Sequence, residues 1–99
     1  AGDMPERGEE EEPSMVQRAD GSWLVDATTP TDLLESVVGV RMEDEVTNVA
    51  AFILERLGRI PTVGTVFDYE NGRFEIVDMD GNRIDKVLVT LLPASPLKP

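Results

Sequence analysis

Three polar residues near the C-terminal end have the spacing of the first ligands in a calcium-binding EF-hand loop. Asp78, Asp80 and Asn82 alternate along the chain, and such a loop takes oxygen ligands from its first, third and fifth positions. The match then ends, because Gly81 comes too early and no glutamate stands at the twelfth position. Asp78 and Asp80 are therefore candidate metal ligands. The alternative interpretation is that Asp80-Gly81 forms a hairpin turn.

Two carboxylates, Asp26 and Asp32, flank the start of a predicted helix and could approach each other as a pair. Helix capping and solvation explain the same two residues without any chemistry. The chain has no histidine and no cysteine, which removes the commonest general base and any thiolate nucleophile or ligand. We therefore expect no enzyme activity, no catalytic residues and no bound cofactor.

Two aromatic residues, Trp23 and Phe74, could form an exposed recognition patch. Both lie in runs that favour β-strands, and aromatic side chains in half-buried strands usually belong to the core. The core is therefore the expected place for both.

The net charge of −11 is unevenly distributed and limits the possible partners. Residues 1–14 contain six acidic side chains and one basic side chain, with no apolar periodicity, which predicts a disordered acidic linker. A surface with this much negative charge repels the phosphate backbone of nucleic acids. Nucleic acid is therefore not expected as a partner. The chain has no apolar run of about 18–20 residues, so no direct membrane insertion is expected.

A β-hairpin and a short helix are predicted at the start of the ordered region. Asp20-Gly21 is a two-residue turn signal between runs at 15–19 and 22–27 that favour strands. The helix that follows has Thr29 as its expected N-cap and Pro30 at its first position. The apolar residues of this helix are expected to form one stripe, made of Leu33, Leu34, Val37 and Val38.

A second helix is predicted from about Thr47 to Leu57. Three of its apolar residues are expected to pack against a sheet, namely Ile53, Leu54 and Leu57. If Leu54 is fully buried, Leu54→Ala would cost about 2–5 kcal/mol. Gly39 and Gly58 are expected to end the two helices in the left-handed conformation.

Three further strands complete the predicted fold. They cover 63–69, 73–79 and 83–92 and are joined by turns at Asn71-Gly72, where both residues tolerate positive φ, and at Asp80-Gly81. The resulting order is β-β-α-α-β-β-β. It predicts an α+β domain over residues 15–92, with both helices on one face of an antiparallel sheet made of the hairpin and a three-stranded meander. Residues 93–99 are expected to form an extended tail.

Four motifs occur together along this domain. They are DGSWLVDATTPTDLLE at 20–35, ERLGRIPTVG at 55–64, FEIV at 74–77 and RIDKVLVT at 83–90. In this combination the chain resembles the transporter-associated domain of the CorC/HlyC family, over about Met15 to Leu92. The resemblance implies a cytosolic, C-terminal module of membrane proteins related to magnesium and cobalt efflux proteins and to haemolysin C homologues. In such proteins a transmembrane domain and a CBS-domain pair come first.

The resemblance implies a non-catalytic module that regulates transport of divalent cations of the magnesium or cobalt type by docking. Its partners would be the CBS pair and the transmembrane domain of the same parent chain, on the cytoplasmic side of an inner or plasma membrane. A homodimer is also expected if a sheet edge, such as the strand at 87–92, is left unpaired.

The family is also similar in fold to a subdomain of FAD-binding oxidoreductases, which implies an alternative function. The domain would then be a small-ligand sensor that binds FAD or an adenine nucleotide. The candidate phosphate-binding turn holds Thr28, Thr29 and Thr31 at the start of the first helix. The sequence has no GxGxxG motif, no P-loop and no basic residue near that turn.

Overall fold

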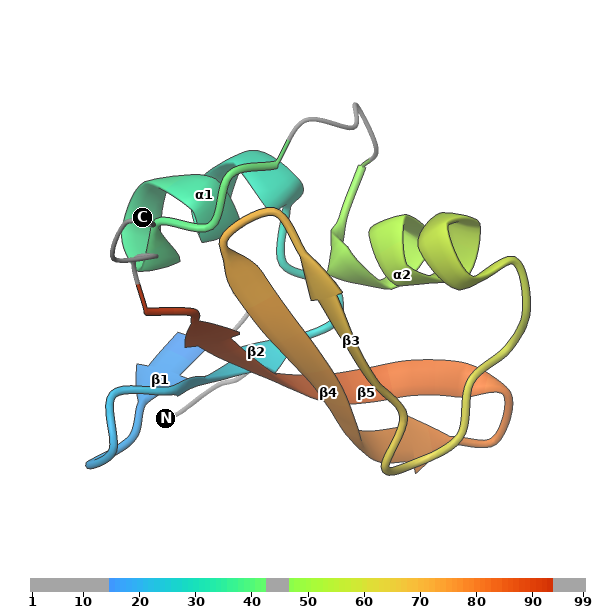
Figure 1. Cartoon of the computed structure of the whole chain (residues 1–99). Coiled ribbons are helices and arrows are strands. Elements are labelled where there is room, and N and C mark those ends of the chain that lie inside the picture. The colour runs from blue at the N-terminus through green and yellow to red at the C-terminus, as the bar shows by residue number, and fades with distance from the viewer. Residues whose placement is uncertain (1–14, 43–46, 94–99) are drawn as a thin grey trace, which may run out of the picture.

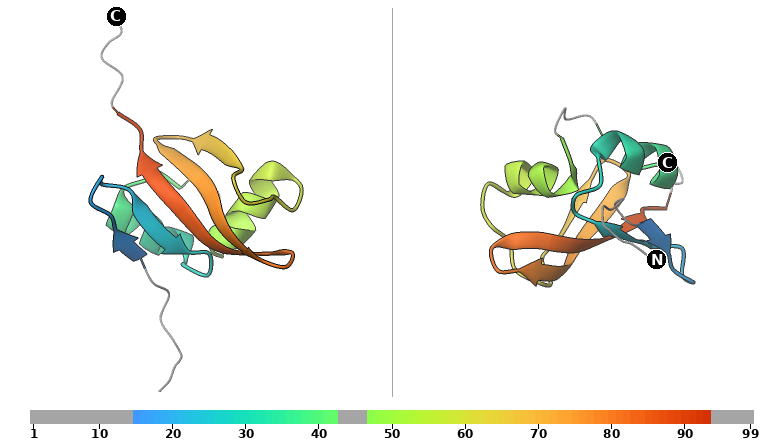
Figure 2. Two further views of the ribbon diagram at one scale, coloured as in Figure 1. Left: turned by 90° about the horizontal axis from the view of Figure 1, so that it is seen from below. Right: turned by 180° about the vertical axis from the view of Figure 1, so that it is seen from behind.

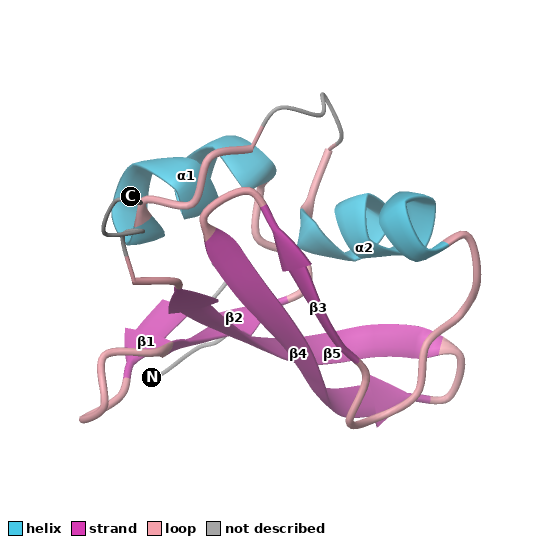
Figure 3. Ribbon diagram, in the orientation of Figure 1, coloured by secondary structure: helices cyan, strands magenta, loops and turns pink. Residues whose placement is uncertain are grey.

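The computed structural model describes residues 15–42 and 47–93, which form a five-stranded antiparallel sheet with two helices on one face (Figures 1 and 3). The strands are β1 (Met15–Gln17), β2 (Trp23–Asp26), β3 (Val66–Tyr69), β4 (Gly72–Asp80) and β5 (Arg83–Leu91), and the helices are α1 (Thr31–Val38) and α2 (Val49–Leu57). This arrangement confirms the predicted α+β class. The expected acidic linker and residues 94–99 of the expected tail lie outside the described residues.

The strand order is β1-β2-β5-β4-β3, so the two helices connect β2 to the far edge of the sheet (Figure 2). β5 lies in the middle and pairs with β2 on one side and with β4 on the other. The expectation that the strand at 87–92 forms a free edge is therefore wrong. β5 is the last strand of the meander and lies next to β2 of the N-terminal hairpin. The backbone N–H and C=O groups on both sides of β5 are therefore hydrogen-bonded to neighbouring strands. In the described residues, the sheet ends at β1 and β3.

The core lies between the helices and the sheet, and it buries only part of the apolar stripe predicted for α1. Leu34 and Val38 of α1 are buried, whereas Leu33 and Val37 remain 39% and 43% exposed. Each helix is only two to three turns long, so only a narrow stripe of its side chains can face the sheet. Residues one position apart point about 100° apart, so Leu33 and Val37 turn away from the core that buries Leu34 and Val38.

α2 turns a different side to the sheet from the one predicted. Phe52 and Ile53 are fully buried, Leu57 is half-buried, and Leu54 is 38% exposed. Leu54 is therefore not fully buried, and the condition on which the larger cost of Leu54→Ala depended is not met. No helix in the described ranges 15–42 and 47–93 has the length and apolar character needed to cross a membrane.

The helix ends confirm the two expected glycine caps and correct one N-cap. Gly39 and Gly58 have φ of 97° and 71°, and their backbone N–H groups donate to carbonyls of the preceding turn. The N-cap of α1 is Pro30 rather than Thr29, and no side chain caps that end. The N-cap of α2 is Asn48, whose side chain accepts a hydrogen bond from the backbone N–H of Ala51.

The β3–β4 turn differs from the predicted Asn71-Gly72 turn. Tyr69 pairs with Gly72, so the turn consists of Glu70 and Asn71, and Glu70 has the positive φ of 51°. Gly72 belongs to β4 and does not have a positive φ. Glycine is required there for space instead, because an added Cβ would lie 2.8 and 2.9 Å from the two methyl carbons of Val40.

Candidate functional site

A hollow of about 280 Å³ lies where the end of β2, the start of α2 and the start of β5 meet. Its lining is mixed in charge and consists of Asp26, Thr28, Asn48, Ala50, Arg83, Ile84, Asp85 and Lys86. Small-molecule sites are usually enclosed and largely apolar, with a few converging polar groups. We therefore consider which of these polar groups remain available to a ligand.

Two charged groups of the hollow, Asp26 and Lys86, neutralise each other. The Lys86 ammonium donates a hydrogen bond to the Asp26 carboxylate across paired positions of β2 and β5. This bond, with the nearby carboxylates of Asp85 and Asp78, raises the pKa of Lys86 although partial burial lowers it. Lys86 therefore stays protonated and cannot act as a general base. Asp26 serves as its charged acceptor, while Asp32, its predicted partner, is exposed in the first turn of α1.

The start of α2 also faces this hollow, but its backbone donors are already occupied. The backbone N–H of Val49 donates to the Thr29 carbonyl, and that of Ala50 donates to the Ala27 carbonyl. The backbone N–H of Ala51 donates to Asn48 Oδ1. Each of these three bonds is 2.9 Å long. A helix N-terminus binds phosphate through such unpaired N–H groups. These three bonds leave the first turn of α2 without the donors that an anion would need.

The three threonines predicted to hold a pyrophosphate do not converge on one ligand. Thr28 is exposed and lines the hollow, whereas Thr29 and Thr31 are buried, with 0% and 7% of their surfaces accessible. The Thr29 N–H donates to the Asp26 carbonyl, and the Thr29 hydroxyl has no hydrogen-bond partner in the part of the chain that the structure describes. The geometry at this turn is that of a tight connection into α1.

The candidate metal ligands lie at the β4–β5 hairpin. Asp80 pairs with Arg83 across a turn made of Gly81 and Asn82, one residue later than predicted, and their side chains form an exposed ion pair of 3.5 Å. Asp78 lies opposite Lys86 in the ladder. Within residues 15–42 and 47–93, no three acidic, histidine or cysteine side chains come close enough together to hold a metal ion.

The aromatic residues follow the core interpretation. Phe74 is fully buried, and Trp23 is half-buried and packs against the core. Phe74 stacks on Phe67 of the neighbouring strand, with ring centroids 5.2 Å apart. The two aromatics therefore do not form an exposed recognition patch.

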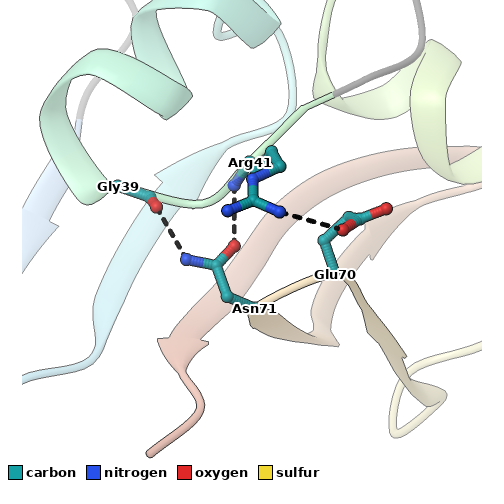
Figure 4. A network of polar contacts seen from close by, with 4 residues as sticks. All are labelled: Gly39, Arg41, Glu70 and Asn71. Carbon is teal, nitrogen blue, oxygen red and sulfur yellow. Dashed lines mark hydrogen bonds and ion pairs between the residues drawn. The ribbon is translucent and has the colours of Figure 1, made fainter. Parts of the chain in front are cut away.

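A polar clamp that the sequence did not indicate joins the segment after α1 to the β3–β4 turn (Figure 4). The Asn71 amide donates to the Gly39 carbonyl at 2.9 Å and accepts from the Arg41 N–H at 2.7 Å. The Arg41 guanidinium lies 3.8 Å from the Glu70 carboxylate. Asn71 matched a turn signal in the sequence, but its partners are distant along the chain and no local pattern identifies them.

We expect Asn71→Ala to lower the free energy of unfolding by about 1–3 kcal/mol, because it removes two hydrogen bonds. Urea denaturation of the purified chain measures the change. Asn82→Ala is the matched control, because it alters an exposed turn asparagine with no side-chain bond in the described residues, and it should stay within about 0.5 kcal/mol of the parent. Equal costs for the two variants would show that the clamp has no energetic role.

Comparison with known proteins places this fold and these motifs in one family. The model of the CorC/HlyC transporter-associated domain matches residues 16–93. A UPF0053 protein of Synechocystis sp. is 40% identical over 97 residues, covering 93% of this chain and 22% of that protein. The polyamine export protein of Salmonella typhimurium is 35% identical over 94 residues, covering 92% of this chain and 21% of the exporter. The chain thus spans about a fifth of the length of these relatives.

Solved structures agree with the comparison of sequences. The transporter-associated domain of a Xylella fastidiosa hemolysin is 43% identical, with a TM-score of 0.74 over 84% of this chain and all of that chain. The same domain in complex with Mg²⁺ and Mn²⁺ is 46% identical, with a TM-score of 0.72 over 80% of this chain and 98% of that chain. These solved chains consist of the domain alone, which shows that the relative folds as a separate unit. The present chain belongs to the CorC/HlyC family of transporter-associated domains.

Proposed function

We propose that this domain is a non-catalytic regulatory module of a membrane cation transporter and that it acts by docking from the cytosolic side. The observation that carries the proposal is family membership over residues 16–93, combined with a span of only about a fifth of membrane transport relatives such as the polyamine exporter. A domain of this size, joined to a much longer chain, can change the transporter through contact alone. The transported species would be a divalent cation of the magnesium or cobalt type.

The charged groups of the domain support docking better than chemistry. Arg41, Arg73, Arg83 and Lys86 each form an ion pair with a carboxylate. Catalytic acids and bases need groups whose pKa values are shifted towards neutrality. The resolved shifts have the opposite direction, since the pKa values of Asp20 and Asp68 are lowered, mainly by hydrogen bonds from Ser22 and Arg73, and the pKa of Lys86 is raised.

Docking regulates a transporter only if its free energy differs between two states of that transporter. The module would then bias the equilibrium between these states by that difference, without binding the transported ion. The CBS pair and the transmembrane part of the same parent chain are the proposed docking partners. The alternative is a sensor for FAD or an adenine nucleotide. The hollow beside Asp26 is its candidate site within the described residues, and the backbone donors of α2 are occupied there.

A cellular experiment tests the regulatory role. Cells that produce the parent protein without residues 15–92 should differ from cells with the intact parent in magnesium and cobalt tolerance and in metal content. Immunoblots of membrane fractions must show equal amounts of the two proteins. Unchanged tolerance and unchanged metal content would contradict the role.

A thermal-shift titration tests the ligand-sensor alternative. A ligand that binds only the folded domain raises its melting temperature as the ligand concentration rises. We expect no rise with FAD or ATP. A saturable rise with either would move the assignment to the sensor.

A further inference from the structure

The pair Asn71-Gly72 joins a side-chain amide to a residue with no side chain that could shield its backbone nitrogen. That nitrogen can attack the side-chain carbonyl carbon of Asn71 and close a five-membered succinimide ring, which is the first step of deamidation. The other two asparagines of the chain, Asn48 and Asn82, precede valine and arginine, whose side chains hinder such an attack. Asn71 is therefore the asparagine whose local sequence favours this reaction most.

The fold requires both members of this pair. A Cβ at Gly72 would lie 2.8 and 2.9 Å from the methyl carbons of Val40. The Asn71 amide forms the polar clamp, in which it donates to the Gly39 carbonyl and accepts from the Arg41 N–H (Figure 4). Replacing either residue therefore has a cost in stability, so packing and hydrogen bonding together maintain a reactive sequence at this turn.

In the folded chain, partners from distant segments hold both groups that have to react. The clamp fixes the side-chain amide with bonds of 2.9 and 2.7 Å. The main-chain carbonyl of Asn71 accepts a hydrogen bond of 2.9 Å from the Leu92 N–H, which fixes the peptide group that contains the Gly72 nitrogen. Ring closure turns the side chain back onto its own main chain, so the amide first has to leave its partners on the segment after α1. The reaction therefore requires local opening of the clamp.

The chemistry consumes one water molecule and releases ammonia. The Gly72 nitrogen gives its proton to a base in the solvent and bonds to the side-chain carbonyl carbon of Asn71, and the Nδ2 group leaves as ammonia. Water then opens the ring by breaking one of its two bonds between carbonyl carbon and nitrogen. The products are aspartate and isoaspartate at position 71. Asn71 is exposed, so water reaches it.

We propose that Asn71 is a modification site, at which the clamp slows deamidation and deamidation in turn breaks the clamp irreversibly. A carboxylate only accepts hydrogen bonds, so in the aspartate product the Gly39 carbonyl would face a second acceptor where Nδ2 now donates at 2.9 Å. Isoaspartate also adds a main-chain carbon to a turn of two residues, Glu70 and Asn71. Either product separates the segment after α1 from the β3–β4 turn. This inference is independent of the proposed docking function.

Peptide mass spectrometry measures the protection, because deamidation adds one mass unit to the peptide that contains position 71. The folded chain and a synthetic peptide of residues 68–75 are incubated in the same neutral buffer. We expect Asn71 to react at least about tenfold more slowly in the folded chain, since two hydrogen bonds of the clamp must open first. Equal rates in the chain and the peptide would overturn the proposal.

Hydrogen exchange of backbone amides identifies the opening that permits the reaction. The Arg41 N–H donates to the side chain of Asn71 and the Leu92 N–H to its main-chain carbonyl, so their exchange reports the breaking of these bonds. The slowing of deamidation should equal the protection of the better protected of these two amides. It should also remain at least about tenfold below that of the most protected core amides. A slowing as large as in the core would show that only global unfolding permits the reaction, and would overturn the role of the clamp.

Asn71→Asp reproduces one product and tests whether the reaction breaks the clamp. We expect a lower urea midpoint and about fivefold less exchange protection at the Arg41 N–H than in the parent chain. Asn82→Asp is the matched control, because it adds the same charge at an exposed turn asparagine with no side-chain bond in the described residues, and it should change neither quantity. Parent chain that has reacted at position 71, separated by anion exchange, should show the same losses as Asn71→Asp. Unchanged protection in either sample would contradict the proposal.

Discussion

Phe52→Ala is expected to lower the free energy of unfolding by about 3–5 kcal/mol. Phe52 is fully buried on α2 and lies at the centre of the aromatic cluster. Its ring centroid is 4.8 Å from that of Tyr69, 5.4 Å from that of Phe74 and 6.2 Å from that of Phe67. The substitution therefore removes apolar burial and three ring contacts, and it leaves a cavity where α2 meets β3 and β4.

Leu54→Ala, on the same helix, is the matched control. Leu54 is 38% exposed, so its truncation should cost about 1 kcal/mol or less. Urea denaturation of both variants gives the comparison. If Leu54→Ala proved as costly as Phe52→Ala, the side of α2 that faces the sheet would be assigned wrongly.

Gly72→Ala is expected to destabilise the domain by about 1–3 kcal/mol through overpacking. The added Cβ would lie 2.8 and 2.9 Å from the Val40 methyl carbons and 3.4 Å from the Phe74 ring. Val40 is fully buried and has a stiff, branched side chain, so it cannot move aside easily. The cost should exceed the gain of up to about 1 kcal/mol that alanine brings by restricting the unfolded chain.

A double-mutant cycle with Val40→Ala separates this steric cause from a backbone cause. In the Val40→Ala background Gly72→Ala should cost at least about 1 kcal/mol less than in the parent, because the clashing methyl groups are gone. Gly81→Ala is the control, since Gly81 has a φ of 64° and open space around its Cβ position. Its cost should not depend on Val40. Additive costs at Gly72 would contradict the packing explanation.

These glycines illustrate how far the sequence alone could predict the fold. Turn signals and apolar periodicity predicted all seven elements in order, as well as the left-handed caps at Gly39 and Gly58. Gly72 and Gly81 both follow turn-forming residues, and local rules treat them alike. Only tertiary packing distinguishes them, because Val40 approaches Gly72 from a distant part of the chain.

The errors have related physical causes. A helix of nine residues with apolar side chains on adjacent positions can turn either of two sides to a sheet, so periodicity could not choose Phe52 over Leu54. The edge position predicted for the last strand depended on where the N-terminal hairpin pairs, which is a long-range property. Thr29 has the residue type of an N-cap, but its neighbour Pro30 takes that position and Thr29 becomes buried.

The candidate sites were less predictable than the fold. The sequence pointed to charged residues at the Asp80 turn and at the turn before α1. Only the structure shows which side chains pair with them. Lys86 neutralises Asp26 from a strand far along the chain, and the clamp by Asn71 joins two distant loops. Pairings between distant segments leave no local signal in a single sequence. The exposure of Ile60 and Val63 likewise became known only from the structure. Apolar residues next to a buried proline would be expected to lie in the core.

Initial cation flux through the purified parent protein in proteoliposomes tests the central claim most directly. The intact protein is compared with one that lacks residues 15–92, at equal reconstituted amounts and with the same orientation in the membrane. If the domain regulates by docking, deletion should change the magnesium or cobalt flux while the deleted protein still transports. An unchanged flux over the full range of cation concentrations would contradict the claim.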